Sequence, residues 1–243
     1  MRLADKTAII TGGATGIGQA IAVAFATEGC RVAIAGRRED KLREAAAAWQ
    51  GEPPILTHAV DVADRKSVAE LFRWAETTLG KVDILVNSAG INTSQRSMAD
   101  MPPETWDEIM HINATGAYNC IHAALEGMRA RKDGLVININ SIGGVRAGVL
   151  GGVAYCAAKF AMTALGTVVA LEESKNGIRV TNICPGEVDT PILESRPTRV
   201  SAEHRSRILQ ASDVAGVVLM VACLPPRVHV PELIIKPTCQ DYA

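Results

Sequence analysis

The sequence predicts a single α/β domain over residues 1–243, built on a doubly wound parallel sheet of about seven strands. Short apolar segments of strand length alternate with helical segments along the whole chain, a pattern typical of this class. No internal stretch has the composition of a linker between two domains. The 243 residues, 48% of them hydrophobic and 21% charged, suit one large domain with a substantial core.

The expected elements follow one another in strand–helix order. Strands are expected at residues 7–10, 31–36, 54–60, 82–86, 135–140, 179–184 and 231–236. Helices are expected at residues 19–28, 39–49, 67–79, 103–131 (one helix or two abutting ones), 154–174 and 213–224. Ser201 and Ser212 have the side chain and the position of helix N-caps. Residues 191–209 contain proline and lack clear periodicity, so a variable substrate lid is expected there.

Composition excludes several classes of function. A formal charge of −1 gives no basic excess for nucleic acid or an anionic membrane. The six cysteines form no CxxC pair and the five histidines have no ligand spacing, so we expect unpaired thiols and no metal site. Residues 7–27 are uncharged, but their glycines argue against a membrane span. The first residues run straight into a strand without a signal peptide, and we expect a cytoplasmic protein.

A glycine-rich loop joins the first expected strand to the next helix. Residues 11–18 read Thr-Gly-Gly-Ala-Thr-Gly-Ile-Gly. Glycine allows a pyrophosphate to approach the main chain, and the helix N-terminus offers that anion unpaired N–H groups. Some loops of this kind only pack a helix on a strand, but the position after the first strand favours a dinucleotide site. The candidate residues are Gly12, Thr15, Gly16, Ile17 and Gly18.

The end of the second expected strand indicates which dinucleotide is bound. An acidic residue there usually binds the ribose hydroxyls of NAD, whereas arginine suits the 2′-phosphate of NADP. This chain has Arg37 and Arg38 and no acid at that position, which favours NADP over NAD. The alternative is that both arginines only begin the helix over 39–49 on its solvent side.

A tyrosine and a lysine four residues apart are the strongest candidate for chemistry. Tyr155 and Lys159 lie on one face of the expected helix over 154–174, where a positive charge favours the phenolate. The alternative is that the two side chains only pack against each other on the surface.

Asn113 lies on the apolar side of the helical segment 103–131. It either forms a hydrogen bond between helices or belongs to the site. The segment Asn87-Ser-Ala-Gly90 is either a ligand-binding strand end or a tight loop.

Taken together, these motifs resemble the short-chain dehydrogenase/reductase family over residues 6–236. The matching residues, in family order, are Thr11-Gly-x-x-x-Gly16-x-Gly18, Asp61-Val62, Asn87-Ser-Ala-Gly90, Asn113, Ser141, Tyr155-x-x-x-Lys159 and Pro185-Gly186 with Thr190. The resemblance implies a Rossmann fold that binds a nicotinamide dinucleotide. It also implies a hydride transfer that interconverts a secondary alcohol and a carbonyl.

The resemblance also assigns roles. Tyr155 is expected to be the general acid and base, Ser141 to hydrogen-bond the substrate oxygen, Lys159 to bind the nicotinamide ribose and lower the tyrosine pKa, and Asn113 to hold a helix kink and a water. The expected cofactor-binding residues include the glycine loop with Arg37 and Arg38, Asp61 and Val62 at the adenine, Asn87 and Gly90 at its ribose, and Val188 and Thr190 at the nicotinamide carboxamide. Ala89, Pro185 and Gly186 complete the set.

The substrate is expected to be a small alcohol or carbonyl compound. The carboxyl end, with Pro237-Thr238, is similar to a branch of the family that includes serine and 3-hydroxy acid dehydrogenases. Arginines at 196, 199, 205 and 207 either hold a carboxylate or lie in solvent. The family implies a homo-oligomer, a tetramer or a dimer, formed through the segments 103–131 and 154–174. Alternative functions are a catalytically inactive nucleotide-sensing or scaffolding protein and an NAD-preferring dehydrogenase.

Overall fold

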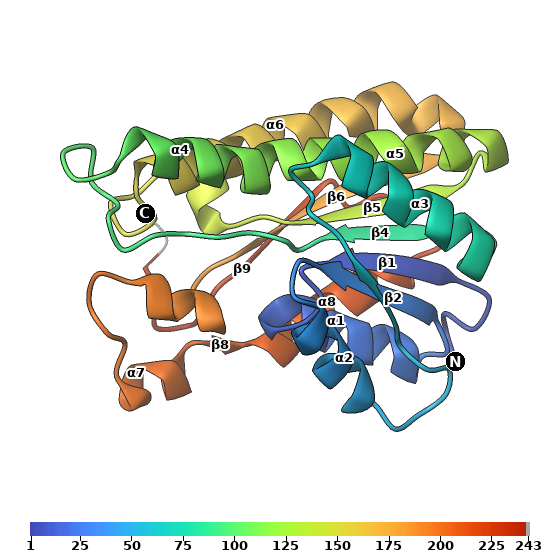
Figure 1. The fold of residues 1–243 in the computed structure, drawn as a ribbon, viewed down its shortest axis with the longest axis horizontal. Helices are drawn as coiled ribbons and strands as arrows, with labels where there is room; N and C mark the ends of the chain where they lie inside the picture. Colours follow the sequence, from blue (N-terminus) through green and yellow to red (C-terminus); the bar gives the residue numbers. More distant parts are fainter. Residues whose placement is uncertain (242–243) are drawn as a thin grey trace.

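A computed structural model describes residues 1–241 and shows one parallel seven-stranded sheet between two layers of helices (Figure 1). The strand order is β3-β2-β1-β4-β5-β6-β9, which confirms the predicted doubly wound sheet. The strands are β1 (Thr7–Thr11), β2 (Arg31–Gly36), β3 (Leu56–Ala59), β4 (Ile84–Asn87), β5 (Gly134–Ile139), β6 (Ile178–Pro185) and β9 (Glu232–Ile235).

The helices cover both faces of the sheet. One layer contains α1 (Gly16–Thr27), α2 (Glu39–Ala47) and α8 (Ala211–Ala222); the other contains α3 (Arg65–Leu79), α4 (Pro103–Met110), α5 (Gly116–Arg131) and α6 (Val153–Glu173). Each layer buries its own apolar cluster against the sheet, with Phe25 and Ile10 on the first side and Leu71 and Met128 on the second. Burial on both faces explains why the strands read as continuous apolar runs.

Capping side chains set where several helices begin. The Asp64 carboxylate accepts a hydrogen bond from Lys66 N at the start of α3, and Ser201 accepts one from His204 N at α7 (Ala202–Arg207), as predicted. The predicted cap of α8 is wrong. Gln210 is the N-cap there, in a capping box with Asp213, which places Ser212 inside the first turn.

The long helical segment between β4 and β5 is continuous but changes its winding. A π-helical turn, η1 (His111–Thr115), joins α4 to α5. Single π-turns inside α-helices often mark functional sites. This one contains Asn113, which is fully buried.

Helix α6 is apolar and long enough to cross a membrane by length and composition, as the core helix of a soluble protein can also be. In this structure it packs against the second face of the sheet and buries Ala158, Lys159 and Met162. Its apolar composition therefore serves the core and the site beneath it.

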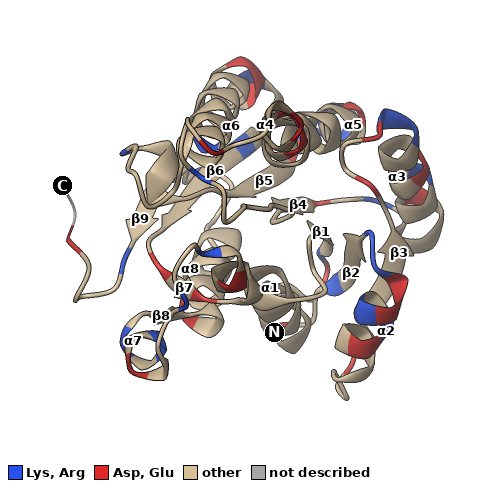
Figure 2. Cartoon of the chain, turned by 60° about the vertical axis from the view of Figure 1, so that its left-hand side comes forward, with Lys and Arg blue, Asp and Glu red and all other residues tan. Residues whose placement is uncertain are grey.

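The segment 191–209 forms a small lobe beside the sheet (Figure 1). It contains η4 (Pro191–Ser195) and α7, and its two ends are joined by the two-stranded parallel pair β7 (Val188–Asp189) and β8 (Leu209–Gln210). Arg205 forms ion pairs with Asp189 and Glu194, and Arg196 with Glu187. Figure 2 shows basic and acidic residues interspersed on α7 and on α2.

Candidate active site

A cavity of about 520 Å³ opens at the carboxyl ends of β1, β4, β5 and β6. This edge is where open α/β sheets bind ligands. Most of the predicted site residues line the cavity. They are Thr15, Gly16, Ile17, Arg38, Gly90, Ser141, Tyr155, Lys159, Pro185, Gly186, Val188 and Thr190.

The glycine loop forms one end of the cavity. Gly12 has φ +66°, and a Cβ there would lie 2.7 Å from Ala89 N, so only glycine fits between β1 and the loop after β4. Gly16 has φ +56°, and a Cβ there would lie 3.2 Å from the Thr190 side chain. Helix α1 begins here without a side-chain cap or an acidic residue in its first turn, so its N–H groups remain available to an anion. These features fit the pyrophosphate of a dinucleotide.

Two arginines flank the dinucleotide end. Arg38 lines the main cavity, and Arg37 lines a second cavity of about 390 Å³ together with Asp61. Asp61 is fixed at the end of β3, because its carboxylate accepts a hydrogen bond from Ala63 N at 3.0 Å. Both arginines are exposed, and neither forms an ion pair within residues 1–241. Their charge is therefore available to a ligand phosphate.

Six predicted residues line neither cavity: Gly12, Gly18, Val62, Asn87, Ala89 and Asn113. Asn87 is buried and belongs to a ladder of asparagines across the sheet. Its Nδ2 donates to Asn138 Oδ1 at 3.0 Å, and Asn138 Nδ2 donates to Asn182 Oδ1 at 3.0 Å. The ladder joins β4, β5 and β6 directly below the cavity. Asn87 therefore supports the cavity floor from behind.

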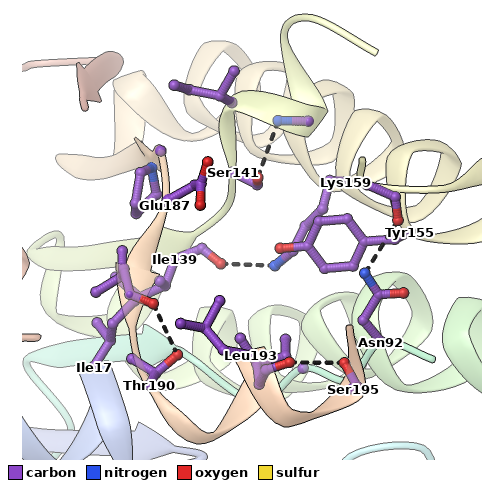
Figure 3. A pocket seen from close by; sticks show the side chains of 18 of the residues that line it. Ile17, Asn92, Ile139, Ser141, Tyr155, Lys159, Glu187, Thr190, Leu193 and Ser195 are labelled. Atoms are coloured by element: carbon purple, nitrogen blue, oxygen red, sulfur yellow. Dashed lines mark hydrogen bonds between the residues drawn. The ribbon is translucent and has the colours of Figure 1, made fainter. Parts of the chain in front are cut away.

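Ser141, Tyr155 and Lys159 lie on one wall of the cavity (Figure 3). Ser141 follows β5, and its hydroxyl oxygen accepts a hydrogen bond from Gly143 N at 3.0 Å, which fixes the side chain. Tyr155 and Lys159 lie one turn apart on α6, with the lysine nitrogen 5.7 Å from the centre of the phenol ring. Lys159 is buried, and its nitrogen donates to Ile139 O at 2.9 Å.

Burial shifts the pKa values of both Tyr155 and Lys159. Burial raises the pKa of the Tyr155 phenol above its ordinary value, and a hydrogen bond with Ser141 opposes that rise. Burial also lowers the pKa of Lys159 to about 8. From the sequence, the lysine charge is expected to depress the tyrosine pKa. In the protein alone, the loss of water around the phenolate outweighs the hydrogen bond with Ser141, so the pKa of Tyr155 is raised.

Asn113 stabilises the loop after β4 instead of contacting the cavity. Its Oδ1 accepts from Ile91 N at 2.8 Å and its Nδ2 donates to Ile91 O at 2.9 Å. A Cβ on Gly90, one residue earlier, would lie 3.8 Å from the lysine nitrogen. Asn113 thereby holds the π-turn against the loop that passes beside Lys159.

Among the cavity residues that the sequence did not single out are Arg96, Glu187 and Gln240. Arg96 donates to Thr93 O, Leu150 O and Ser195 O at 2.6, 2.5 and 3.1 Å, which ties three loops together. No sequence motif marks these residues. They meet only because the strands that carry their loops converge at one edge of the sheet.

Comparison with known proteins gives the family. A family model described as short chain dehydrogenase matches residues 6–200. An uncharacterised oxidoreductase of Staphylococcus aureus strain MRSA252 is 35% identical over 236 residues, which cover 97% of this chain and 98% of the relative. One from Staphylococcus saprophyticus is 34% identical over 239 residues, with 98% and 99% coverage.

Solved structures of similar fold superpose on nearly the whole chain. A closed form of serine dehydrogenase complexed with NADP⁺ superposes with a TM-score of 0.89 at 27% identity, covering 98% of this chain and 97% of the other. An alcohol dehydrogenase from Thermococcus sibiricus complexed with 5-hydroxy-NADP gives 0.87 at 28% identity, with 98% and 99% coverage. With Tyr155, Lys159 and Ser141 on one wall of the cavity and a glycine loop at its end, the chain belongs to the short-chain dehydrogenase family.

Proposed function

We propose that this protein is an NADP-dependent oxidoreductase that interconverts a secondary alcohol and a carbonyl compound. The observation that carries the proposal is the cavity that joins a dinucleotide loop to Ser141, Tyr155 and Lys159. A catalytically inactive sensor or scaffold of the same fold has no use for a half-buried phenol beside a buried lysine. That arrangement favours an enzyme.

Each residue of the site has a different role in the proposed reaction. A bound nicotinamide supplies or accepts the hydride. Hydride transfer to a carbonyl builds negative charge on its oxygen, and donors fixed at that oxygen stabilise the transition state. In reduction the Ser141 hydroxyl donates a hydrogen bond to the oxygen and the Tyr155 phenol gives it a proton; in oxidation Tyr155 takes that proton back. Lys159 supplies positive charge beneath the phenol and binds the nicotinamide ribose.

The NADP preference is proposed from the two guanidinium groups at the dinucleotide end that form no ion pair within residues 1–241. We expect Arg37→Ala or Arg38→Ala to weaken NADPH binding about 10-fold or more, since a hydrogen bond to a charged group contributes about 1.5–3 kcal/mol. NADH, which lacks the 2′-phosphate, should bind the variants and the wild type alike. Fluorescence titration of both cofactors measures this. Arg43→Ala on the helix that follows, α2, where Arg43 pairs with Glu39, is the matched control. Equal NADPH affinity in all four proteins would contradict the preference.

The cavity also suits a hydroxy acid, in agreement with the resemblance to serine and 3-hydroxy acid dehydrogenases. Arg96 has no carboxylate partner within residues 1–241, whereas Arg196 and Arg205 are both paired with acids. Burial and the neighbouring Arg196 lower the pKa of Arg96. A part-buried cation that has no carboxylate partner among the described residues favours an anionic ligand.

Replacing Arg96 tests the hydroxy acid preference. We expect Arg96→Gln to lower kcat/KM about 10-fold or more for a 3-hydroxy acid, but not for the neutral secondary alcohol of equal chain length. Arg96→Lys, which keeps the charge, should retain part of the difference, and Arg205→Gln should not change it. If Arg96→Gln slowed both substrates equally, Arg96 would only hold the loops together.

The surroundings of the site support further parts of the proposal. The segment 191–209 is proposed as the substrate lid, since Ile192, Leu193, Ser195 and Arg196 line the cavity. A homotetramer or dimer through α5 and α6 is proposed from their exposed apolar side chains, Tyr118, Phe160, Val168 and Leu171. A cytoplasmic location is proposed from six unpaired cysteines, four of them buried.

A further inference from the structure

The C-terminal segment, residues 236–241, returns to the chain's own active site. Strand β9 pairs in parallel with β6, so both strands end at the edge that carries the cavity. The pairing continues past the strands, since Gly186 N donates to Ile235 O at 2.7 Å. The C-terminal segment therefore lies beside the Pro185-Gly186 turn, which lines the cavity just before Val188.

Gln240 is held in one orientation by this arrangement. Its Oε1 accepts a hydrogen bond from Glu187 N at 2.9 Å. Its backbone is fixed by Gln240 N donating to Pro237 O at 3.1 Å and by Lys236 Nζ donating to Gln240 O at 2.7 Å. A Cβ on Gly186 would collide with the Gln240 oxygen, which gives a local reason for glycine at that position.

Glu187, the partner of Gln240, is the junction between the sheet and the proposed lid. Its carbonyl accepts from Leu209 N at 3.1 Å, and its carboxylate lies 3.0 Å from Arg196 and 2.8 Å from His204. The C-terminal segment also reaches the end of α7, where the Cys239 thiol donates to Arg207 O at 3.3 Å. Gln240 thus contacts the residue that binds Leu209, Arg196 and His204 of the lid.

We propose that Gln240 is a specificity-determining residue that donates a hydrogen bond from its amide nitrogen to an acceptor oxygen of the substrate other than the reacting oxygen. The backbone N–H of Glu187 is a donor, so it must face the side-chain oxygen of Gln240. The side-chain nitrogen of Gln240 therefore points away from Glu187. That nitrogen has no hydrogen-bond partner within residues 1–241. Gln240 lines the same cavity as Ser141 and Tyr155. The proposal rests on the oxidoreductase function proposed above.

Two neutral ketones of similar shape test the donor. Methyl 3-oxobutanoate carries an ester where 2-hexanone has methylene groups. We expect the wild type to prefer the ester in kcat/KM, mainly through KM, and both Gln240→Glu and Gln240→Met to reduce that preference about 5- to 10-fold. Thr238→Ala, an exposed change in the same segment, should leave it unaltered. A preference that survives in both Gln240 variants, or that falls equally in Thr238→Ala, overturns the proposal.

Amide hydrogen exchange at Glu187 tests the geometry without turnover. Gln240→Glu keeps an oxygen for the Glu187 N–H, whereas Gln240→Met does not. Protection of that amide should therefore persist in the first variant and fall in the second. Equal exchange in the wild type and Gln240→Met overturns the proposal even if the enzyme reduces neither ketone. Failure of the oxidoreductase function is a different result, namely no NADPH oxidation by the wild type on any carbonyl compound.

Discussion

Replacing Tyr155 by phenylalanine should lower kcat about 1,000-fold while leaving NADPH affinity almost unchanged. A positioned general acid contributes about 10²–10⁴-fold to rate, and among residues 1–241 no other phenol lines the cavity. Phenylalanine keeps the ring that packs in α6 and removes only the hydroxyl. The loss should therefore appear in kcat, with little change in the stability of the fold.

The measurement is NADPH oxidation with a panel of carbonyl compounds, together with NADPH titration of each protein. Tyr118→Phe is the matched control, because Tyr118 is exposed on α5 and outside the cavity. If Tyr155→Phe and wild type reduced every active substrate at similar rates, the catalytic role of Tyr155 would be wrong. If the wild type bound NADPH but oxidised none, the inactive sensor would be the better description.

The fold was predictable because its signals are local. The buried strands are short apolar runs, and β1 to β5 are each followed by a helix, so the alternation alone predicts the parallel sheet. Tyr155 and Lys159 were predictable for the same reason, since a spacing of four places them on one helix face. The cap of α8 shows the limit of local signals. Ser212 has the right chemistry, but Gln210 and Asp213 form the reciprocal pair that begins the helix.

The remaining part of the site depends on contacts between distant segments. Arg96, Glu187 and Gln240 follow β4, β6 and β9 and meet because those strands end at one edge of the sheet. Asn87 belongs to its ladder because of the register between β4, β5 and β6. The pKa of Tyr155 depends on how much water the folded chain removes from the phenol. None of these quantities is encoded in residue spacing.

Replacing Lys159 by methionine should make the protein more stable at neutral pH while lowering its activity about 100-fold or more. Lys159 is 4% exposed, and its pKa falls from 10.5 to about 8 on burial. That shift corresponds to about 3 kcal/mol of cost for burying the charge. Methionine removes the charge and leaves Ile139 O without its donor, at a cost of about 1 kcal/mol. The net gain in unfolding free energy should be about 2 kcal/mol.

The pH dependence identifies the cause of that gain. Between pH 8 and pH 10.5 the unfolded chain still binds the proton that folded Lys159 has lost, so this group raises wild-type stability as the pH rises. The advantage of Lys159→Met, measured by urea unfolding, should therefore be fully present below pH 8 and shrink toward pH 10.5. Lys159→Arg keeps a charge and should lose activity without gaining stability. If the difference in unfolding free energy between Lys159→Met and wild type stayed constant across this pH range, packing and not charge would be its cause. Burying the charge of Lys159 would then cost the fold no stability.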